Sequence, residues 1–224
     1  MSAIVERLAR LSVSGLADQF DKLGKVPPVL ARELKPIGAA VKFAGLAYCV
    51  KGRKREGSGW KAIPGPRDAL YDSLDERVSA GAVLVLDTGG YDDTAVFGGG
   101  TGLALKQRGC AGAIIDGAVR DVEELASMGL PTLARAVSAI RFVGRFAVTE
   151  VDRPVEVRGL AGPVTVAPGD LVLADDDGVI VVPAALAEEV IALAEKADRV
   201  EALVKADVLR GVPRREASRR HGKG

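Results

Sequence analysis

Histidine, cysteine and aromatic residues are scarce in this sequence. Its 224 residues include one histidine, two cysteines and one tryptophan, and aromatic side chains make up 4% of the total. The single histidine, His221, lies near the C-terminus, which excludes histidine-based catalytic triads and zinc sites built on paired histidines. Cys49 and Cys110 each stand among apolar neighbours, and this setting indicates buried free thiols rather than a disulfide or a metal pair.

Long apolar runs and an excess of one charge are also missing. No apolar run reaches the ~18 residues that a membrane span needs. The N-terminal stretch carries Glu6, Arg7 and Arg10, so it lacks the uninterrupted core of a signal peptide. With 31 basic and 30 acidic residues the net charge is +1, which gives no general attraction to nucleic acid. We therefore expect a cytoplasmic protein that binds neither membrane nor nucleic acid.

Two common nucleotide-binding patterns are absent as well. No phosphate-binding loop of the Gly-x-x-x-x-Gly-Lys-Ser/Thr type occurs. The run from Gly98 to Gly102 does not fit Gly-x-Gly-x-x-Gly, because position 105 is leucine. The chemistry that remains is oxygen-ligand metal binding, anion binding by backbone amides, and recognition by arginine.

The hydrophobic pattern predicts alternating strands and helices in the middle of the chain. Two strands without polar alternation, typical of strands covered on both faces, are expected at Ala82–Asp87 and Ala111–Asp116. The other expected strands are Ala39–Val50, Phe146–Val151, Val155–Arg158, Gly169–Ala174 and Val179–Val182. Helices are expected around Ile4–Leu11, from Ser12 to Leu23, at Asp68–Val78, at Thr101–Gln107, after Asp121, and from Ala184 to about Leu209.

This order of elements predicts parallel strand pairing and an α/β fold. We find no internal repeat and no linker, so residues 1–224 are predicted to form one domain, with a C-terminal helix and a basic tail from about residue 184.

The glycine-rich segment Gly98–Gly102 stands before an expected helix. Glycines at this place let successive N–H groups face outward at the positive end of the helix dipole, where a carboxylate or phosphate is held well. The alternative is a close-packed turn between strand and helix that binds nothing.

The pair Arg120-Asp121 follows a buried strand and opens a helix. In open α/β folds, ligand sites form at the carboxyl ends of strands. Arg120 offers a planar fork to a carboxylate, and Asp121 offers a hard oxygen ligand to Mg²⁺ or Mn²⁺. The alternative is that Asp121 caps the helix and Arg120 forms a surface ion pair.

Two further polar segments have plainer interpretations. The basic stretch from Lys51 to Lys61, with Trp60 beside it, could grip nucleic acid, but its glycines favour a solvated loop. The run Asp175-Asp176-Asp177-Gly178 could bind a metal by its charge, but it is more typical of a tight turn.

Together these segments resemble one family. Gly109-x-x-Gly112-x-x-x-Asp116-Gly117-x-Val119-Arg120-Asp121 resembles its central signature, and Gly169-Asp170-Leu171-Val172-x-Ala174-Asp175-x-Asp177-Gly178-Val179-x-Val181-Val182-Pro183 resembles its second. The family is that of the regulator of ribonuclease activity A and 4-hydroxy-4-methyl-2-oxoglutarate aldolase, and the resemblance covers nearly the whole chain.

The resemblance implies a swivelling ββα-type fold, with a central mixed sheet flanked by helices and assembled as a homotrimer or hexamer. It implies a divalent-metal-dependent lyase that cleaves a C–C bond of a small 2-oxo dicarboxylic acid and releases pyruvate, as aldolase or oxaloacetate decarboxylase. The resemblance implies that Asp121 holds Mg²⁺ or Mn²⁺ and that Arg120 is the catalytic residue that contacts the 2-oxo acid. It also implies that the substrate carboxylate is bound by Gly98, Gly99, Gly100 and Thr101.

One position departs from the aldolase pattern. The pattern has an aspartate 21 positions before the arginine, where it orients the water that moves the proton, and here that position is Gly99. A glycine has no side chain for this task, so retro-aldol proton transfer should suffer more than decarboxylation; Asp92 or Asp93 could substitute. A second hypothesis therefore stays open, that of a non-catalytic regulator that binds a protein such as ribonuclease E.

Overall fold

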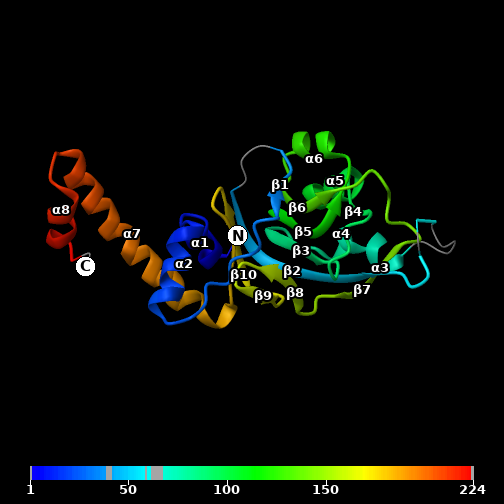
Figure 1. The fold of residues 1–224 in the computed structure, drawn as a ribbon, viewed down its shortest axis with the longest axis horizontal. Coiled ribbons are helices and arrows are strands. Elements are labelled where there is room, and N and C mark those ends of the chain that lie inside the picture. The colour runs from blue at the N-terminus through cyan, green and yellow to red at the C-terminus, as the bar shows by residue number, and fades with distance from the viewer. Residues whose placement is uncertain (1, 39–41, 59, 62–67, 223–224) are drawn as a thin grey trace.

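The computed structural model describes residues 2–38, 42–58, 60–61 and 68–222, and it has one large mixed sheet with helices around it (Figure 1). The nine strands of this sheet are β1 (Lys35–Pro36), β2 (Phe43–Lys54), β3 (Ala82–Asp87), β4 (Ala95–Phe97), β5 (Gly112–Val119), β6 (Thr132–Val137), β7 (Phe146–Val151), β10 (Leu171–Asp175) and β11 (Gly178–Val182). A separate antiparallel ribbon is formed by β8 (Val155–Gly159) and β9 (Gly162–Val166).

The sheet has the order β1-β6-β5-β3-β2-β10-β11, with β4 paired to β5 and β7 paired to β2. Strands β2, β3, β5 and β6 run parallel, as the alternation of strands and helices predicts. Strand β2 is unusually long because its first part pairs with β10 and its last part with β7. A mixed α/β fold with a curled central sheet is thereby confirmed.

Helices surround the sheet, and one of them projects beyond it (Figure 1). They are α1 (Ala3–Leu8), α2 (Val13–Lys22), α3 (Ala69–Asp72), α4 (Leu74–Arg77), α5 (Gly99–Gln107), α6 (Val122–Met128), α7 (Ala187–Leu209) and α8 (Arg214–Arg220), with a 3-10 turn at Ala184–Leu186. None of the helices in the described ranges is long and apolar enough to cross a membrane.

Three apolar clusters hold these elements together. One joins the sheet to α3–α6, a second joins it to the β8–β9 ribbon, and a third joins α1, α2 and the start of α7 to β10 and β11. Helix α2 begins as predicted, because the Ser12 hydroxyl accepts the Gly15 N–H at 3.0 Å. Cys49 and Cys110 are buried and free, which confirms the expectation from their neighbours.

The second half of α7 projects from the body and carries α8 at its far end (Figure 1). The predicted basic tail is therefore a helix, and Asp207 explains why. This carboxylate, 5% exposed, is hydrogen bonded to Arg210, the residue that follows α7, and lies 3.1 Å from His221 Nε2 beyond α8. We call residues 200–222 the arm.

Several predicted boundaries are wrong. The strand expected at Ala39–Val50 is β2, which continues four residues further, so Lys51–Lys54 belong to a strand rather than a loop. Residues 39–41 of the expected strand and residue 59 of the basic stretch lie outside the described residues. The basic residues of β2 are neutralised by carboxylates, with Lys51 paired to Glu150, Arg53 to Asp87 and Lys54 to Asp93.

The helix expected at Asp68–Val78 is two short helices that meet at Ser73. Strands β1, β4, β6 and β9 were not expected. The aspartate run forms the predicted turn between β10 and β11, and Asp175 has two structural bonds there. It accepts the Asp177 N–H at 3.0 Å and the Val13 N–H of α2 at 2.8 Å.

Candidate active site

The glycine run forms the start of a helix rather than a loop. Gly98 is the extended residue before α5, and the helix begins at Gly99, two residues earlier than expected. Gly99, Gly100 and Thr101 therefore supply the first-turn amides, which have no partner within a helix. The Gly99 amide donates to Asp121 Oδ2 at 3.1 Å, while Gly100 and Thr101 line a cavity.

Space explains why two of these positions are glycine. A Cβ at Gly98 would lie 2.7 Å from Asp121 Oδ2, and a Cβ at Gly99 would lie 2.0 Å from Glu124 Oε2. A Cβ at Gly100 would meet nothing within 4 Å. Gly98 and Gly99 thus allow two carboxylates to lie directly against the backbone at the start of α5.

Asp121 does not cap the helix that it opens. Strand β5 runs on to Val119, three residues beyond its predicted end, and Asp121 has φ +55° and ψ +44°. This left-handed conformation is costly for a residue with a side chain and is concentrated at functional sites. The carboxylate makes no capping bond in α6 and turns instead to the Gly99 amide and to Arg120 Nε, 3.4 Å away. The capping alternative is therefore wrong, while the ion pair of Arg120 is present.

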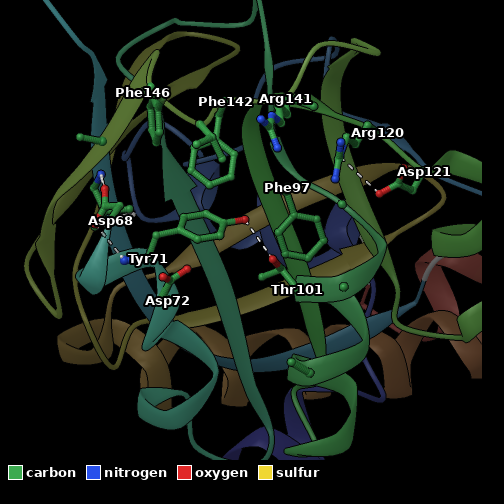
Figure 2. A pocket seen from close by; sticks show the side chains of 18 of the residues that line it. Asp68, Tyr71, Asp72, Phe97, Thr101, Arg120, Asp121, Arg141, Phe142 and Phe146 are labelled. Atoms are coloured by element: carbon green, nitrogen blue, oxygen red, sulfur yellow. Dashed lines mark hydrogen bonds and ion pairs between the residues drawn. The ribbon is translucent and has the colours of Figure 1, made fainter. Parts of the chain in front are cut away.

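The cavity beside this pair has a volume of about 770 Å³. Gly98, Gly100, Thr101, Arg120 and Asp121 all line it, so the structure brings together every predicted site residue except Gly99, which faces Glu124. Figure 2 shows the Arg120-Asp121 pair at one side of the cavity and an aromatic cluster at the other. The cavity thus offers a polar end with a cation, a carboxylate and free amides.

The opposite wall comes from segments whose proximity no sequence pattern predicts. Tyr71 of α3 donates its hydroxyl to the Val96 carbonyl at 2.7 Å and lies 3.1 Å from the Thr101 hydroxyl. Burial raises the pKa of Tyr71 to about 12, so this phenol stays protonated at neutral pH. The ring packs on Phe142 with centroids 4.4 Å apart. Arg141 also lines the cavity, from the segment between β6 and β7.

The aspartates in and near this wall are engaged in different contacts. Asp68 is occupied by three backbone amides: Oδ1 accepts from Leu70 and Tyr71 at 3.1 Å, and Oδ2 accepts from Val148 at 2.6 Å. Asp93, one of the two suggested substitutes for the missing aspartate, is paired with Lys54, and neither it nor Asp92 is among the described residues that line the cavity. The described ranges also contain no group of three metal-ligating side chains.

Fold and site together define a mixed α/β protein in which the first-turn amides of a helix, an arginine and one outward-turned carboxylate surround a cavity. The family model for RraA-like proteins, described as Aldolase/RraA, matches residues 13–181. The chain therefore belongs to the RraA-like family.

Individual relatives cover the chain to different extents. A Burkholderia mallei protein named "Putative 4-hydroxy-4-methyl-2-oxoglutarate aldolase" is 35% identical over 160 residues, 71% of this chain and 87% of that protein. Protein DlpA of Legionella pneumophila is 26% identical over 85% of this chain, which spans only 29% of that protein's length. The solved structure of Streptomyces coelicolor RraAS2, described as an unusual member of the RNase ES inhibitor RraA protein family, superposes with a TM-score of 0.75 at 26% identity. The match covers 92% of this chain and 96% of that one.

Proposed function

We propose that the protein is a divalent-metal-dependent lyase that cleaves a C–C bond of a small 2-oxo dicarboxylic acid and releases pyruvate. The substrate class is that of 4-hydroxy-4-methyl-2-oxoglutarate and oxaloacetate. The observation that carries the proposal is Asp121, held in a left-handed conformation with its carboxylate turned away from its own helix and toward the start of α5. The names of the aldolase relatives support the same class.

The donor chemistry fits Mg²⁺ or Mn²⁺. Asp121 is about one-third exposed at the cavity, and its Oδ2 is engaged by Gly99 and Arg120, which leaves Oδ1 for a cation. A single carboxylate suits Mg²⁺, which keeps several of its waters. When bound, such an ion withdraws electrons from the 2-oxo group and stabilises the enolate that bond cleavage leaves.

The chain's own residues bind and orient the acid. The amides of Gly100 and Thr101, at the positive end of α5, suit a substrate carboxylate. The Arg120 guanidinium, 44% exposed beside Asp121, suits the 2-oxo acid end and the negative charge that grows there. Tyr71 holds the Thr101 side chain in place from the opposite wall. Decarboxylation needs no further base, because no hydroxyl proton has to leave.

A pyruvate-release assay tests this function. Oxaloacetate and 4-hydroxy-4-methyl-2-oxoglutarate are each incubated with the protein, with and without Mg²⁺ or Mn²⁺. We expect metal-dependent pyruvate release that Asp121→Ala abolishes without loss of the fold. Glu123→Ala, two residues further on α6 and exposed, is the matched control and should keep its turnover. Wild-type turnover in Asp121→Ala would remove this carboxylate from the site.

The likeness to RraAS2 favours one other function, that of a regulator that binds a ribonuclease of the ribonuclease E type. Such a regulator needs no metal at Asp121. Titration calorimetry with Mn²⁺ on wild type and Asp121→Ala separates the two, since only the lyase requires an affinity that the substitution removes. Inhibition of ribonuclease E cleavage without metal binding would favour the regulator.

We also propose assembly as a homotrimer or hexamer, with the arm as a contact surface. In the first half of α7, Val190 is fully buried within the chain and Leu193 is half-buried. The exposed apolar residues lie further along, with Leu203 52% and Leu209 88% exposed. Light scattering at micromolar concentration should give three or six times the monomer mass, and a monomer would contradict this assembly.

A further inference from the structure

A second arginine lies beside the short strand that leads to α5. Strand β4 pairs on one side with the end of β5, and there the Arg120 N–H donates to the Phe97 carbonyl at 3.0 Å. On its other side β4 forms a parallel bridge with Arg141, because the N–H and the carbonyl of Ala95 are bonded to the two residues that flank this arginine, at 2.8 and 3.1 Å. Strand β4 therefore fixes the backbones of Arg120 and Arg141 on its two flanks.

Both arginines face the candidate cavity. Ala95 and Phe97, two residues apart on β4, line the cavity, and so do Arg120 and Arg141. Figure 2 shows the two arginine side chains on the same side of the cavity as Phe97. Neighbouring strands lie about 4.8 Å apart, so the backbones on the two flanks of β4 are about 10 Å apart. Two long side chains that start from these flanks can hold the two ends of one small diacid.

The two cations differ in how far a carboxylate already compensates them. Arg120 Nε lies 3.4 Å from Asp121, whereas no carboxylate among the described residues forms an ion pair with Arg141, which is exposed. A guanidinium presents a planar fork of N–H groups that fits a carboxylate with two hydrogen bonds. The charge and the hydrogen-bond donors of Arg141 are thus available to an acid in the cavity.

The opposite wall repels a carboxylate. Asp72 and Asp75, from α3 and α4, line the cavity there. Figure 2 shows Asp72 beside Tyr71, across the cavity from Arg120. Like charges repel more strongly near protein than in bulk water, because the effective dielectric constant is lower. A diacid whose 2-oxo end lies at Arg120 is therefore directed to place its second carboxylate on the β4 side, next to Arg141.

We infer that Arg141 binds the second carboxylate of the substrate and makes the site prefer 2-oxo acids with two carboxylates to those with one. This inference rests on the proposed function, which places the 2-oxo end of the acid at Arg120 and the start of α5. In 4-hydroxy-4-methyl-2-oxoglutarate the bound group is the C5 carboxylate. Its charge does not change while the C3–C4 bond breaks, so Arg141 stabilises the bound acid and the transition state equally.

Two acids that the proposed reaction cannot cleave test the inference by binding alone. 2-Oxoglutarate and 2-oxopentanoate share a five-carbon chain and a 2-oxo acid end, but only the first has a carboxylate at C5. In calorimetry with Mn²⁺-loaded protein, 2-oxoglutarate should bind ~10-fold to ~10²-fold more tightly, the range of a hydrogen bond to a charged group. In Arg141→Gln the two acids should bind within about threefold of each other, because the variant loses only the contact to C5.

Three further arginine variants serve as controls. Arg55→Gln removes an arginine that lines the same cavity from the end of β2, and it should keep the wild-type preference. Arg153→Gln removes an exposed arginine that is not among the described residues lining the cavity, and it should also keep the preference. Arg141→Lys keeps the charge but loses the planar fork, so it should retain part of the preference.

Turnover gives a second measurement. With 4-hydroxy-4-methyl-2-oxoglutarate, Arg141→Gln should raise KM by ~10-fold to ~10²-fold and leave kcat within about threefold of wild type, the pattern of a contact that is equal in ground state and transition state. The urea midpoint should stay at the wild-type value, because the Arg141 side chain is exposed.

The outcomes separate this inference from the proposed function. A wild-type protein that prefers 2-oxoglutarate through Arg141 but releases no pyruvate would overturn the lyase and leave the carboxylate site standing. Equal binding of the two acids by wild type, or a preference that survives in Arg141→Gln, would overturn the role of Arg141. A preference lost in Arg55→Gln instead would assign the second carboxylate to Arg55 and overturn it as well. A wild-type protein that binds neither acid and releases no pyruvate would overturn both proposals.

Discussion

Asp68 should be one of the carboxylates whose removal destabilises this protein most. Its two oxygens receive three backbone amides, two at the start of α3 and one from Val148 on β7. Loss of the helix cap costs about 0.5–2 kcal/mol. Val148 is 6% exposed, and leaving its amide without a partner costs about 1–3 kcal/mol more. We therefore expect Asp68→Ala to lower the free energy of unfolding by about 2–4 kcal/mol.

Urea denaturation at a fixed protein concentration measures this loss. With an m-value of about 3 kcal/mol/M, the midpoint should fall by about 1 M. Asp68→Asn keeps one acceptor oxygen but presents an amide donor to the other N–H, so it should lose roughly half as much. Asp75→Ala, which removes a carboxylate from the same cavity wall, should change stability by less than about 0.5 kcal/mol. An Asp68→Ala protein as stable as the Asp75→Ala control would refute the reasoning.

Three further outcomes are expected. Asp170 accepts the Ala167 N–H in the turn before β10 and the Ala184 N–H just after β11, so Asp170→Ala should cost about 2–3 kcal/mol in urea denaturation and Asp170→Asn about half of that. Burial raises the pKa of Cys49 to about 12 and also raises that of Cys110, so neither thiol should react with Ellman's reagent at pH 8 before urea unfolds the protein; rapid reaction of the native protein would contradict their burial. The arginine and histidine partners of Asp207 hold its pKa below the ordinary value, so its contribution to docking α8 is complete above about pH 4 and is lost as pH falls through the lowered pKa. Hydrogen-exchange protection of the α8 amides should therefore drop in acid, and in Asp207→Asn at pH 7, and unchanged protection in that variant would assign the docking to other contacts.

The strands that could be predicted are those whose apolar pattern is uninterrupted. Both β3 and β5 are apolar along most of their length because layers cover both of their faces. Strand β6 lacks this signal, since Arg135 stands in its middle. The structure tolerates that charge because Asp116 of the adjacent β5 lies 2.5 Å from Arg135, with both side chains 8% exposed. A pattern of hydrophobicity along one segment cannot reveal a charge pair between two strands.

The candidate site likewise contains residues that the sequence predicts and residues that it does not. Arg120 and Asp121 could be predicted because they follow a buried strand and match a family signature. Tyr71 could not, because only the tertiary fold brings α3 against the start of α5. The position of Glu124 on α6 was expected, but its approach to Gly99 outside the cavity depends on how α5 and α6 pack.

The long strand β2 has a consequence for how the chain is made. Residues 43–54 leave the ribosome early, yet their partners β7 and β10 follow roughly 100 to 130 residues later. Until then β2 pairs only with β3, and its free edge is open to other chains. Pairings this distant in sequence slow folding and prolong the exposure of aggregation-prone intermediates. Truncation before β10 should therefore yield an insoluble product rather than a smaller folded unit, and yield in the cell should depend on how well chaperones shield this one strand.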